Sequence, residues 1–392
     1  MKKIKAFLTA LVFLVLTVIL VHFSVDFNVK HSGDGMGTWI NAYKDLSYKA
    51  IDKNLDNNTY MMIGSSEFQH GMDTPYHPTQ VFRDMGMDVM CVGSAYNQCL
   101  PHAILMGAVG PQLQTKKVVL ILSPAWFMKS GLKKEAFGIR FSETQYMAML
   151  RNRKLSSDLK RDIAKRSEYL LGKDDSKQSI VKRYDRIFLK GRANPMDKAY
   201  FLLRKQLLDE REAVNIFTVW KFKGERKYKE QKKNMSGKVS DWEKLKKEAD
   251  EEYSKRSTNN EFHMDNTLYT TRVKPVLKKK KGFQKNAKFP PDSPEYGDLD
   301  LFLRVCEEQG IKVELILLPV NGYWFDYTGL TKEKRDELPK LIEKNIRKYK
   351  NVKFVSFMDE DYNDGFLEDS YHPAGKGWTE INEEAYRFFS KG

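Results

Sequence analysis

The stretch TYMMIGSSEFQHGM, residues 59–72, decides the fold and poses the first question about function. Its largely apolar beginning stops at Gly64-Ser65-Ser66-Glu67, and a more polar, helix-compatible run follows. A strand that gives way to a helix at such a turn is typical of α/β proteins, in which ligands and active sites lie at the carboxyl ends of parallel strands. The two serines are therefore either an N-cap of the helix or a nucleophile held on a sharp strand-to-helix turn.

Four later segments carry the same strand signal, at residues 88–95, 116–127, 312–321 and 352–360. Amphipathic helical stretches separate the strands, at residues 98–112, 296–309 and 331–349. One further helix is expected before the first strand, over residues 38–55. Alternating strands and helices predict an α/β fold, a three-layer α/β/α sandwich with a parallel sheet that is covered on both faces.

The middle of the chain has a different composition. Residues 142–290 are highly charged, helical in pattern and poor in strand signals, and they contain two basic runs, at residues 221–233 and 277–285. The simplest interpretation is a helical insertion between the third and fourth strands. Its basic surface is either a solvated helical face or a face that binds a polyanion.

The N-terminus carries an apolar segment at residues 6–21, preceded by Lys2, Lys3 and Lys5. Counted on to Val25, the segment has the roughly 20 residues that a membrane-spanning helix needs. The lysines are expected to stay in the cytoplasm, which places the rest of the chain outside the cell. The alternative is a cleaved signal peptide, but no small-x-small cleavage site follows the apolar run.

Composition adds three limits. The 392 residues include 67 Lys+Arg and 52 Asp+Glu, a net charge of +15, which attracts polyanions or anionic lipids. An extracellular location argues against nucleic acid as the partner and, with only 3 cysteines, fits the outer face of a Gram-positive membrane. Three cysteines are no disulfide framework, and whether Cys91 and Cys99 pair stays open.

We therefore expect four parts. They are the cytoplasmic lysines and transmembrane anchor at 1–26, a juxtamembrane linker and helix at 27–58, a discontinuous catalytic domain at 59–141 and 291–392, and the charged insertion at 142–290.

A second candidate for chemistry lies near the C-terminus, in EDSYHPAGKGW at residues 368–378. Asp369 and His372 are three residues apart, so on a turn the carboxylate can accept a hydrogen bond from the imidazole and fix its tautomer. Each motif alone is weak, because serines often cap helices and Asp-x-x-His is common in loops. A serine turn after the first strand and this motif before the last helix together predict a Ser66-His372-Asp369 relay.

One group of residues has near metal-ligand spacing, namely His70, Asp73 and His77. Pro75 and Pro78 interrupt the helix that would align them, so no metal site is expected.

This combination resembles the SGNH/GDSL-type hydrolases, whose nucleophilic serine is the third residue of Gly-Asp-Ser. By that match Ser66 is the nucleophile, and Ser65 stands in place of the aspartate. More closely, the chain resembles the DltD family of D-alanyl-lipoteichoic acid biosynthesis proteins. The motifs that carry this resemblance follow the apolar N-terminus in order: IGSSEF, VGSAYNQ, ILSPAWF, SPEYGDL, LPVNGYWFDY and DSYHPAGKGW.

The resemblance implies an extracytoplasmic, membrane-anchored acyltransferase that needs no cofactor. It would pass D-alanine through an ester on Ser66 to glycerol-phosphate hydroxyls of lipoteichoic acid, with His372 taking the serine proton and Asp369 orienting the imidazole. The implied partners are lipoteichoic acid, the membrane-bound O-acyltransferase of the pathway and its D-alanyl carrier protein. Two alternatives stay open, a D-alanyl-carrier thioesterase or esterase, and a non-catalytic scaffold.

The oxyanion hole is where the sequence departs from the SGNH pattern. SGNH enzymes use an Asn side chain from a Gly-x-Asn-Asp block, but residues 123–126 here read SPAW. The candidates for stabilising the oxyanion are the backbone N–H groups of Ser66 and Gly93 and the side chains of Asn97, Gln98 and Asn321.

Overall fold

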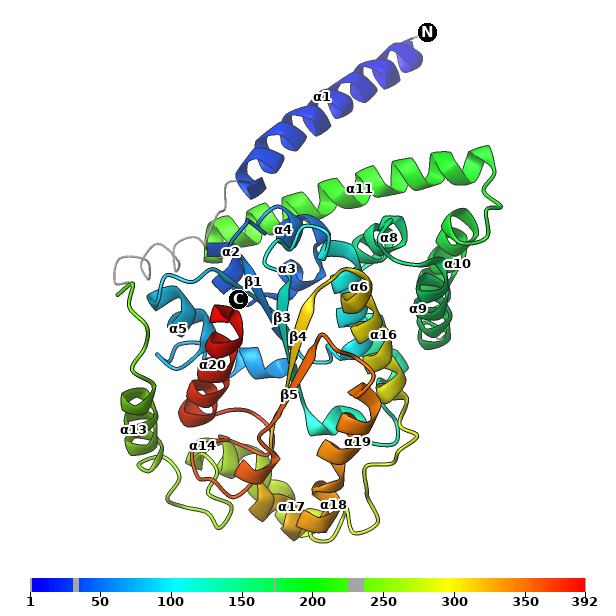
Figure 1. The fold of residues 1–392 in the computed structure, drawn as a ribbon. Coiled ribbons are helices and arrows are strands. Elements are labelled where there is room, and N and C mark those ends of the chain that lie inside the picture. Colours follow the sequence, from blue (N-terminus) through cyan, green and yellow to red (C-terminus); the bar gives the residue numbers. More distant parts are fainter. Residues whose placement is uncertain (1, 31–34, 173, 225–235, 392) are drawn as a thin grey trace.

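The computed structural model describes residues 2–30, 35–172, 174–224 and 236–391 (Figure 1). Its centre is one sheet of five parallel strands in the order β2-β1-β3-β4-β5. The strands are β1 Tyr60–Gly64, β2 Val89–Gly93, β3 Lys117–Leu122, β4 Lys312–Leu317 and β5 Val352–Ser356. All five coincide with segments that the sequence predicted as strands, so the parallel α/β sheet is confirmed.

Helices cover both faces of this sheet. Alternate side chains of a strand point to opposite faces, and accordingly Met61 and Ile63 lie in one hydrophobic core while Met62 lies in the other. The first core is closed by α6 Cys99–Val109, α16 Pro294–Glu308 and α19 Glu337–Ile346. The second is closed by α5 Pro78–Asp84 and α20 Gly375–Ser390. The three-layer arrangement is therefore confirmed.

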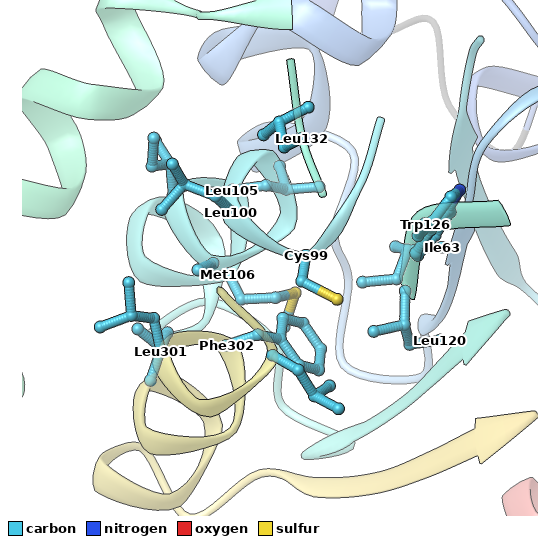
Figure 2. Packing of buried hydrophobic residues seen from close by; sticks show 14 of the residues in the cluster. Ile63, Cys99, Leu100, Leu105, Met106, Leu120, Trp126, Leu132, Leu301 and Phe302 are labelled. Carbon is cyan, nitrogen blue, oxygen red and sulfur yellow. The ribbon is translucent and has the colours of Figure 1, made fainter. Parts of the chain in front are cut away.

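The first core joins segments that are far apart in the chain. Figure 2 shows side chains of α6 and α16 packed together next to side chains of β1 and β3, among them Met106, Phe302, Ile63 and Leu120. The SPEYGDL motif contributes here, because the buried Glu295 of α16 accepts a hydrogen bond from the N–H of Cys99 at the start of α6. Cys91, Cys99 and Cys306 are all buried and free.

The segment before β1 differs from the expected single helix over residues 38–55. It forms three short helices, α2 Gly35–Thr38, α3 Ala42–Leu46 and α4 Tyr48–Asp52. Asn41 and Ser47 adopt extended backbone and accept hydrogen bonds from the N–H groups of Tyr43 and Ala50, so each caps the helix that follows it. The side chain–backbone bonds of these two residues break the helical pattern.

The chain between β3 and β4 is helical, as predicted. It contains η2 Pro124–Phe127, α7 Lys134–Arg140, α8 Glu143–Arg151, α9 Ser157–Leu170, α10 Asp175–Phe188, α11 Pro195–Val219, η3 Trp220–Gly224, α13 Trp242–Tyr253, α14 Asn266–Leu268, η4 Tyr269–Val273, η5 Lys274–Val276 and α15 Leu277–Lys280. Most of the basic run 221–233 lies outside the described residues. Tyr146 of α8 and Ile163 of α9 are fully buried in the first core. The division into a catalytic domain and an insertion stays a prediction.

The N-terminal helix α1, Lys2–Lys30, stands apart from the sheet in Figure 1. Its segment Lys2–Ser24 is long and apolar enough to cross a membrane, and none of its most apolar window is buried. Anchors and signal sequences both have this character. The remaining short elements are η1 Ser66–Gln69, α17 Gly322–Thr328, α18 Lys332–Arg335 and η6 Met358–Glu360.

Candidate active site

The turn after β1 holds the two serines in different environments. Ser65 occupies the cap position of η1, but its side chain makes no capping bond; its hydroxyl instead donates to the Ser94 carbonyl at 3.3 Å. The Ser66 hydroxyl lies 2.9 Å from His372 Nε2. Neither serine is a helix cap, and only Ser66 faces a base.

Glycine is required where β1 and β2 end side by side. Gly64 pairs with Gly93 in the parallel ladder. A Cβ on Gly93 would lie 2.4 Å from the Phe68 ring and 2.9 Å from the backbone of Gly64. Phe68 is fully buried and stacks on Trp378 of α20. The absence of a side chain at Gly93 therefore lets Phe68 fix η1, and with it Ser66, against the last helix.

The loop 368–374 completes the arrangement from the other end of the chain. Nδ1 of His372 lies 3.0 and 2.9 Å from the two carboxylate oxygens of Asp369, so its N–H donates to Asp369 while Nε2 accepts from Ser66. Asp369 also accepts the backbone N–H groups of Tyr371 and His372, which curls the loop into a turn. Ser66, His372 and Asp369 thus have the geometry in which an imidazole can accept a serine proton.

The charges of this loop support that proton transfer. Burial alone would lower the pKa of His372, but its hydrogen bond to Asp369 and the negative charges of Asp369, Glu67 and Glu368 outweigh burial and raise it. Burial acts to raise the pKa of Asp369, yet the His372 hydrogen bond and charge and the two backbone N–H donors lower it to about 2. Asp369 is therefore ionised at neutral pH, a state that stabilises a protonated His372 imidazole.

A second imidazole stands against the first. The rings of His70 and His372 are stacked, with centroids 3.8 Å apart and planes within 7° of parallel. His70 Nδ1 lies 2.5 Å from a carboxylate oxygen of Glu368, the residue next to Asp369. Adjacent carboxylates thus hold two stacked histidines. From the sequence, His70 was weighed only as a metal ligand. Its position four residues after Ser66 and the adjacent Glu368-Asp369 pair were the signals that could have revealed its place in the site.

Two arginines from the segment 142–290 reach these carboxylates. Arg256, just after α13, lies 3.5 Å from Glu368, and Arg272 of η4 lies 3.9 Å from Asp369. The Arg272 side chain is 60% exposed, so it stands at the rim of the site. These two ion pairs between the middle of the chain and the C-terminal loop were not predicted from the sequence, because ion pairs between distant segments leave no periodic signal.

The candidate oxyanion donors differ in their availability. Asn321 caps α17: its side chain accepts the N–H of Trp324 and donates to the Phe262 carbonyl, so its amide is already engaged. Burial raises the pKa of the Asp45 carboxyl, and a backbone hydrogen bond from Gly93 is among the contacts that offset part of this rise, which places the Gly93 N–H beside Asp45.

The other two candidates follow β2 in the chain. Gln98 has its side-chain oxygen buried without a hydrogen-bond partner among the described residues. Asn97 is 6% exposed, and within the described part of the chain its side chain makes no hydrogen bond. Among the described residues, the side-chain amides of Asn97 and Gln98 thus both keep a donor unused, whereas the Asn321 amide is engaged.

The geometry offers little to a metal ion. His70, Asp369 and His372 place one possible ligand atom each within 4.8 Å of one another. However, the two imidazole planes are nearly parallel and stacked, so their in-plane lone pairs do not converge on one ion. The set His70, Asp73 and His77 does not form, because His77 is buried and its ring contacts Thr79 and the Phe68 carbonyl.

Comparison with known proteins now adds the family. The sequence profile described as DltD protein matches residues 35–390, which include Ser66, Asp369 and His372. The chain belongs to the DltD family. It is 30% identical over 350 residues to Protein DltD of Bacillus subtilis (strain 168), covering 87% of this chain and 85% of that protein. Protein DltD of Staphylococcus aureus (strain NCTC 8325 / PS 47) is 26% identical over 336 residues, covering 85% and 82%.

A third relative agrees with these two. Protein DltD of Lacticaseibacillus rhamnosus is 26% identical over 339 residues, covering 84% of this chain and 77% of that protein. The DltD matches therefore span the sheet, the candidate site and the helical middle, and the resemblance seen in the motifs is confirmed.

Proposed function

We propose that this DltD-family protein is an extracytoplasmic serine acyltransferase of teichoic acid D-alanylation. It passes D-alanine through an ester on Ser66 to glycerol-phosphate hydroxyls of lipoteichoic acid. Family membership supports the pathway. The observation that carries the chemistry is the 2.9 Å contact between Ser66 Oγ and His372 Nε2, with Asp369 on the opposite ring nitrogen.

The first half-reaction forms the seryl ester. His372 accepts the hydroxyl proton of Ser66 as Oγ attacks the carbonyl carbon of a D-alanyl ester or thioester. The tetrahedral intermediate collapses, the bond to the donor breaks, and the His372 imidazolium gives its proton to the departing oxygen or sulfur. D-alanine is then bound to Ser66, and His372 is neutral again.

The second half-reaction uses the same residues in the opposite sense. A glycerol hydroxyl of the polymer gives its proton to His372 and attacks the seryl ester, and His372 returns the proton to Ser66 Oγ as the ester bond breaks. We propose the Ser66 N–H and the Asn97 side chain as donors to the oxyanion in both halves. Losing one such donor costs roughly 100- to 1,000-fold in rate in other acyl-transfer enzymes.

The N-terminal helix supports a location at the membrane. We propose that Lys2–Ser24 is an uncleaved anchor with its lysines in the cytoplasm, so that the sheet lies outside the cell. The polymer is then within reach, and the D-alanyl donor is delivered across the membrane by the O-acyltransferase of the pathway. The cytoplasmic carrier protein does not meet the site directly in this arrangement.

The test measures the D-alanyl ester content of lipoteichoic acid in cells that lack their own copy of this protein and express the wild type or a variant instead. Wild type and Ser65→Ala should restore the esters, and Ser66→Ala should not, at equal amounts of membrane-bound protein. If Ser66→Ala restored the esters, the acyltransferase proposal would be overturned and the non-catalytic scaffold would remain. Purified wild type that releases free D-alanine equally fast with and without polymer would instead indicate an esterase.

A further inference from the structure

Helix α11 is apolar on two opposite faces. One face packs into the protein through Phe201, Leu208 and Ile216, which are at most 9% exposed. The other carries an apolar row of four residues at intervals of seven, four and seven, which places them on one side of a helix. The row is Met196, Leu203, Leu207 and Val214, exposed by 81%, 68%, 67% and 37%.

Such a row is costly in water. Burying the side chain of a leucine away from water is favourable. Soluble proteins rarely leave several large apolar side chains together on the surface, and those that do use them for binding. The outer face of α11 therefore has the composition of a surface that is covered in the working protein.

A contact with α1 shows where the outer face of α11 lies relative to the apolar N-terminal helix. His22 Nδ1 of α1 lies 2.5 Å from a carboxylate oxygen of Glu210. Glu210 belongs to the same side of α11 as the row, seven residues after Leu203 and four before Val214. His22 is near the end of the apolar segment Lys2–Ser24. The apolar row thus borders the place where the membrane-spanning helix reaches the outer surface, and Figure 1 shows the two helices extending from there on the same side of the molecule.

We propose that α11 is an interfacial helix whose apolar row lies among the head groups and upper acyl chains of the outer leaflet. The proposal rests on the membrane anchor of the proposed function. Lipid is the occupant because α1 holds this face at the bilayer at all times, whereas a partner protein has to find it. Arg211 lies exposed to one side of the row, where basic side chains of interfacial helices reach anionic head groups.

The proposed contact would orient the whole protein. In Figure 1 α17, which follows the carboxyl end of β4, lies at the opposite end of the molecule from α11. With α11 on the bilayer, the catalytic edge of the sheet faces away from lipid and toward the polymer. The anchor alone would leave this orientation free.

Spin-label depth measurements on the full-length chain test the proposal. The native cysteines are buried, so a label attaches selectively to Leu203→Cys or Leu207→Cys. The protein is reconstituted in vesicles of phosphatidylcholine and phosphatidylglycerol, and label relaxation by oxygen is compared with relaxation by a water-soluble nickel complex. Leu14→Cys in α1 reports membrane insertion, and Lys244→Cys on α13, with a side chain 69% exposed, reports water.

We expect oxygen to relax the labels at positions 203 and 207 and the nickel complex to be partly excluded from them. The ratio of the two relaxation effects should lie between the ratio at position 14 and the ratio at position 244. Water-like values at both, with Leu14→Cys membrane-like, would overturn the proposal. Spin–spin broadening between copies would overturn it in favour of a dimer. A water-like value at Leu14→Cys would overturn the anchor itself, which separates failure of the proposed location from failure of the interfacial helix.

Discussion

In the proposed mechanism His372 exchanges a proton with Ser66, and the groups around its ring decide at which pH it can accept one. Asp369 contacts Nδ1, Glu67 and Glu368 add negative charge, and the His70 ring covers one face. Arg272 stands behind Asp369. The imidazole must be neutral to take the serine proton, so everything that stabilises its charged form moves activity toward higher pH.

The first prediction concerns pH. The carboxylates raise the pKa of His372 above its ordinary value of about 6.5, so the rate at which a fluorophosphonate modifies Ser66 should rise with pH through an inflection above that value. Glu368→Gln removes one negative charge and should move the inflection to lower pH. An inflection that stays in place or moves upward in Glu368→Gln would contradict this account. The measurement is the pH dependence of the labelling rate.

The second prediction concerns the stacked ring. His70→Ala removes the face against which His372 rests, and roughly a 10-fold or larger loss of labelling rate is expected, because small displacements of a catalytic group are expensive. His70→Phe keeps a flat ring and should retain most of the rate. The bond from Trp378 to the His70 carbonyl is to backbone and survives in both variants. Equal rates in the two variants would show that stacking does not position His372.

At the scale of elements, the site depends on helices that never touch it. The buried Arg335 of α18 binds Asp361 and Asp326, each at 2.6 Å. The Asp361 carbonyl accepts the N–H of Gly322, where α17 begins, and the Asn321 N–H donates to Ser370 in the catalytic loop. This chain of contacts joins α18 to the loop that carries Asp369 and His372.

The third prediction follows from that chain. Arg335→Met leaves the Asp361 carboxylate, 1% exposed, without its main partner, and a destabilisation of about 3–5 kcal/mol is typical for a broken buried pair. The control is Lys340→Met, because the Lys340–Glu337 pair is exposed and should not affect the unfolding midpoint measurably. The measurement is thermal unfolding of the two variants. Equal unfolding midpoints would show that the ion pairs of Arg335 do not stabilise the fold.

Most of these elements could be predicted from the sequence, and the exceptions have a physical reason. Strands β1 to β4 were predictable because each is a largely apolar run that the sheet buries on both faces, whereas β5, at the edge of the sheet, is only partly buried. Ser66, Asp369 and His372 were predictable because a turn after the first strand and an Asp-x-x-His loop are local patterns. The break of residues 38–55 into three helices was missed because two capping side chains outweigh the helical pattern.

The missed parts of the site are contacts between distant segments. His70 meets His372, and Arg256 meets Glu368, only after folding. The Glu368-Asp369 pair hints at the first contact, but no spacing marks the second. Asn321 was expected as an oxyanion candidate, yet its side chain caps α17. A capping Asn and a catalytic Asn look alike in sequence.

On the scale of the whole molecule, charge and membrane act together. The net charge of +15 is spread over a protein whose proposed substrate carries a phosphate on every unit. Part of the charge lies in the run 277–285, close in sequence to Arg272 at the rim of the site. With the proposed anchor, such a basic surface would keep a polyanion near the proposed catalytic edge.

The fourth prediction is the salt dependence of that contact. The affinity of the full-length protein in detergent for fluorescent poly(glycerol phosphate) should fall by roughly 10-fold or more between low and moderate salt, as counterion release requires. Replacing Lys278, Lys279 and Lys280 by Gln should reduce the steepness. Affinity that is flat across the salt range would show that the basic surface does not hold the polymer.

The central claim is that Ser66 is a nucleophile activated by His372, and one measurement tests it directly. The full-length protein in detergent is incubated with a fluorophosphonate, and its intact mass is measured for wild type, Ser65→Ala, Ser66→Ala and His372→Ala. The account predicts a single adduct on wild type and Ser65→Ala and none on the other two. An adduct that persists in Ser66→Ala, or a wild type that stays unmodified, would contradict it.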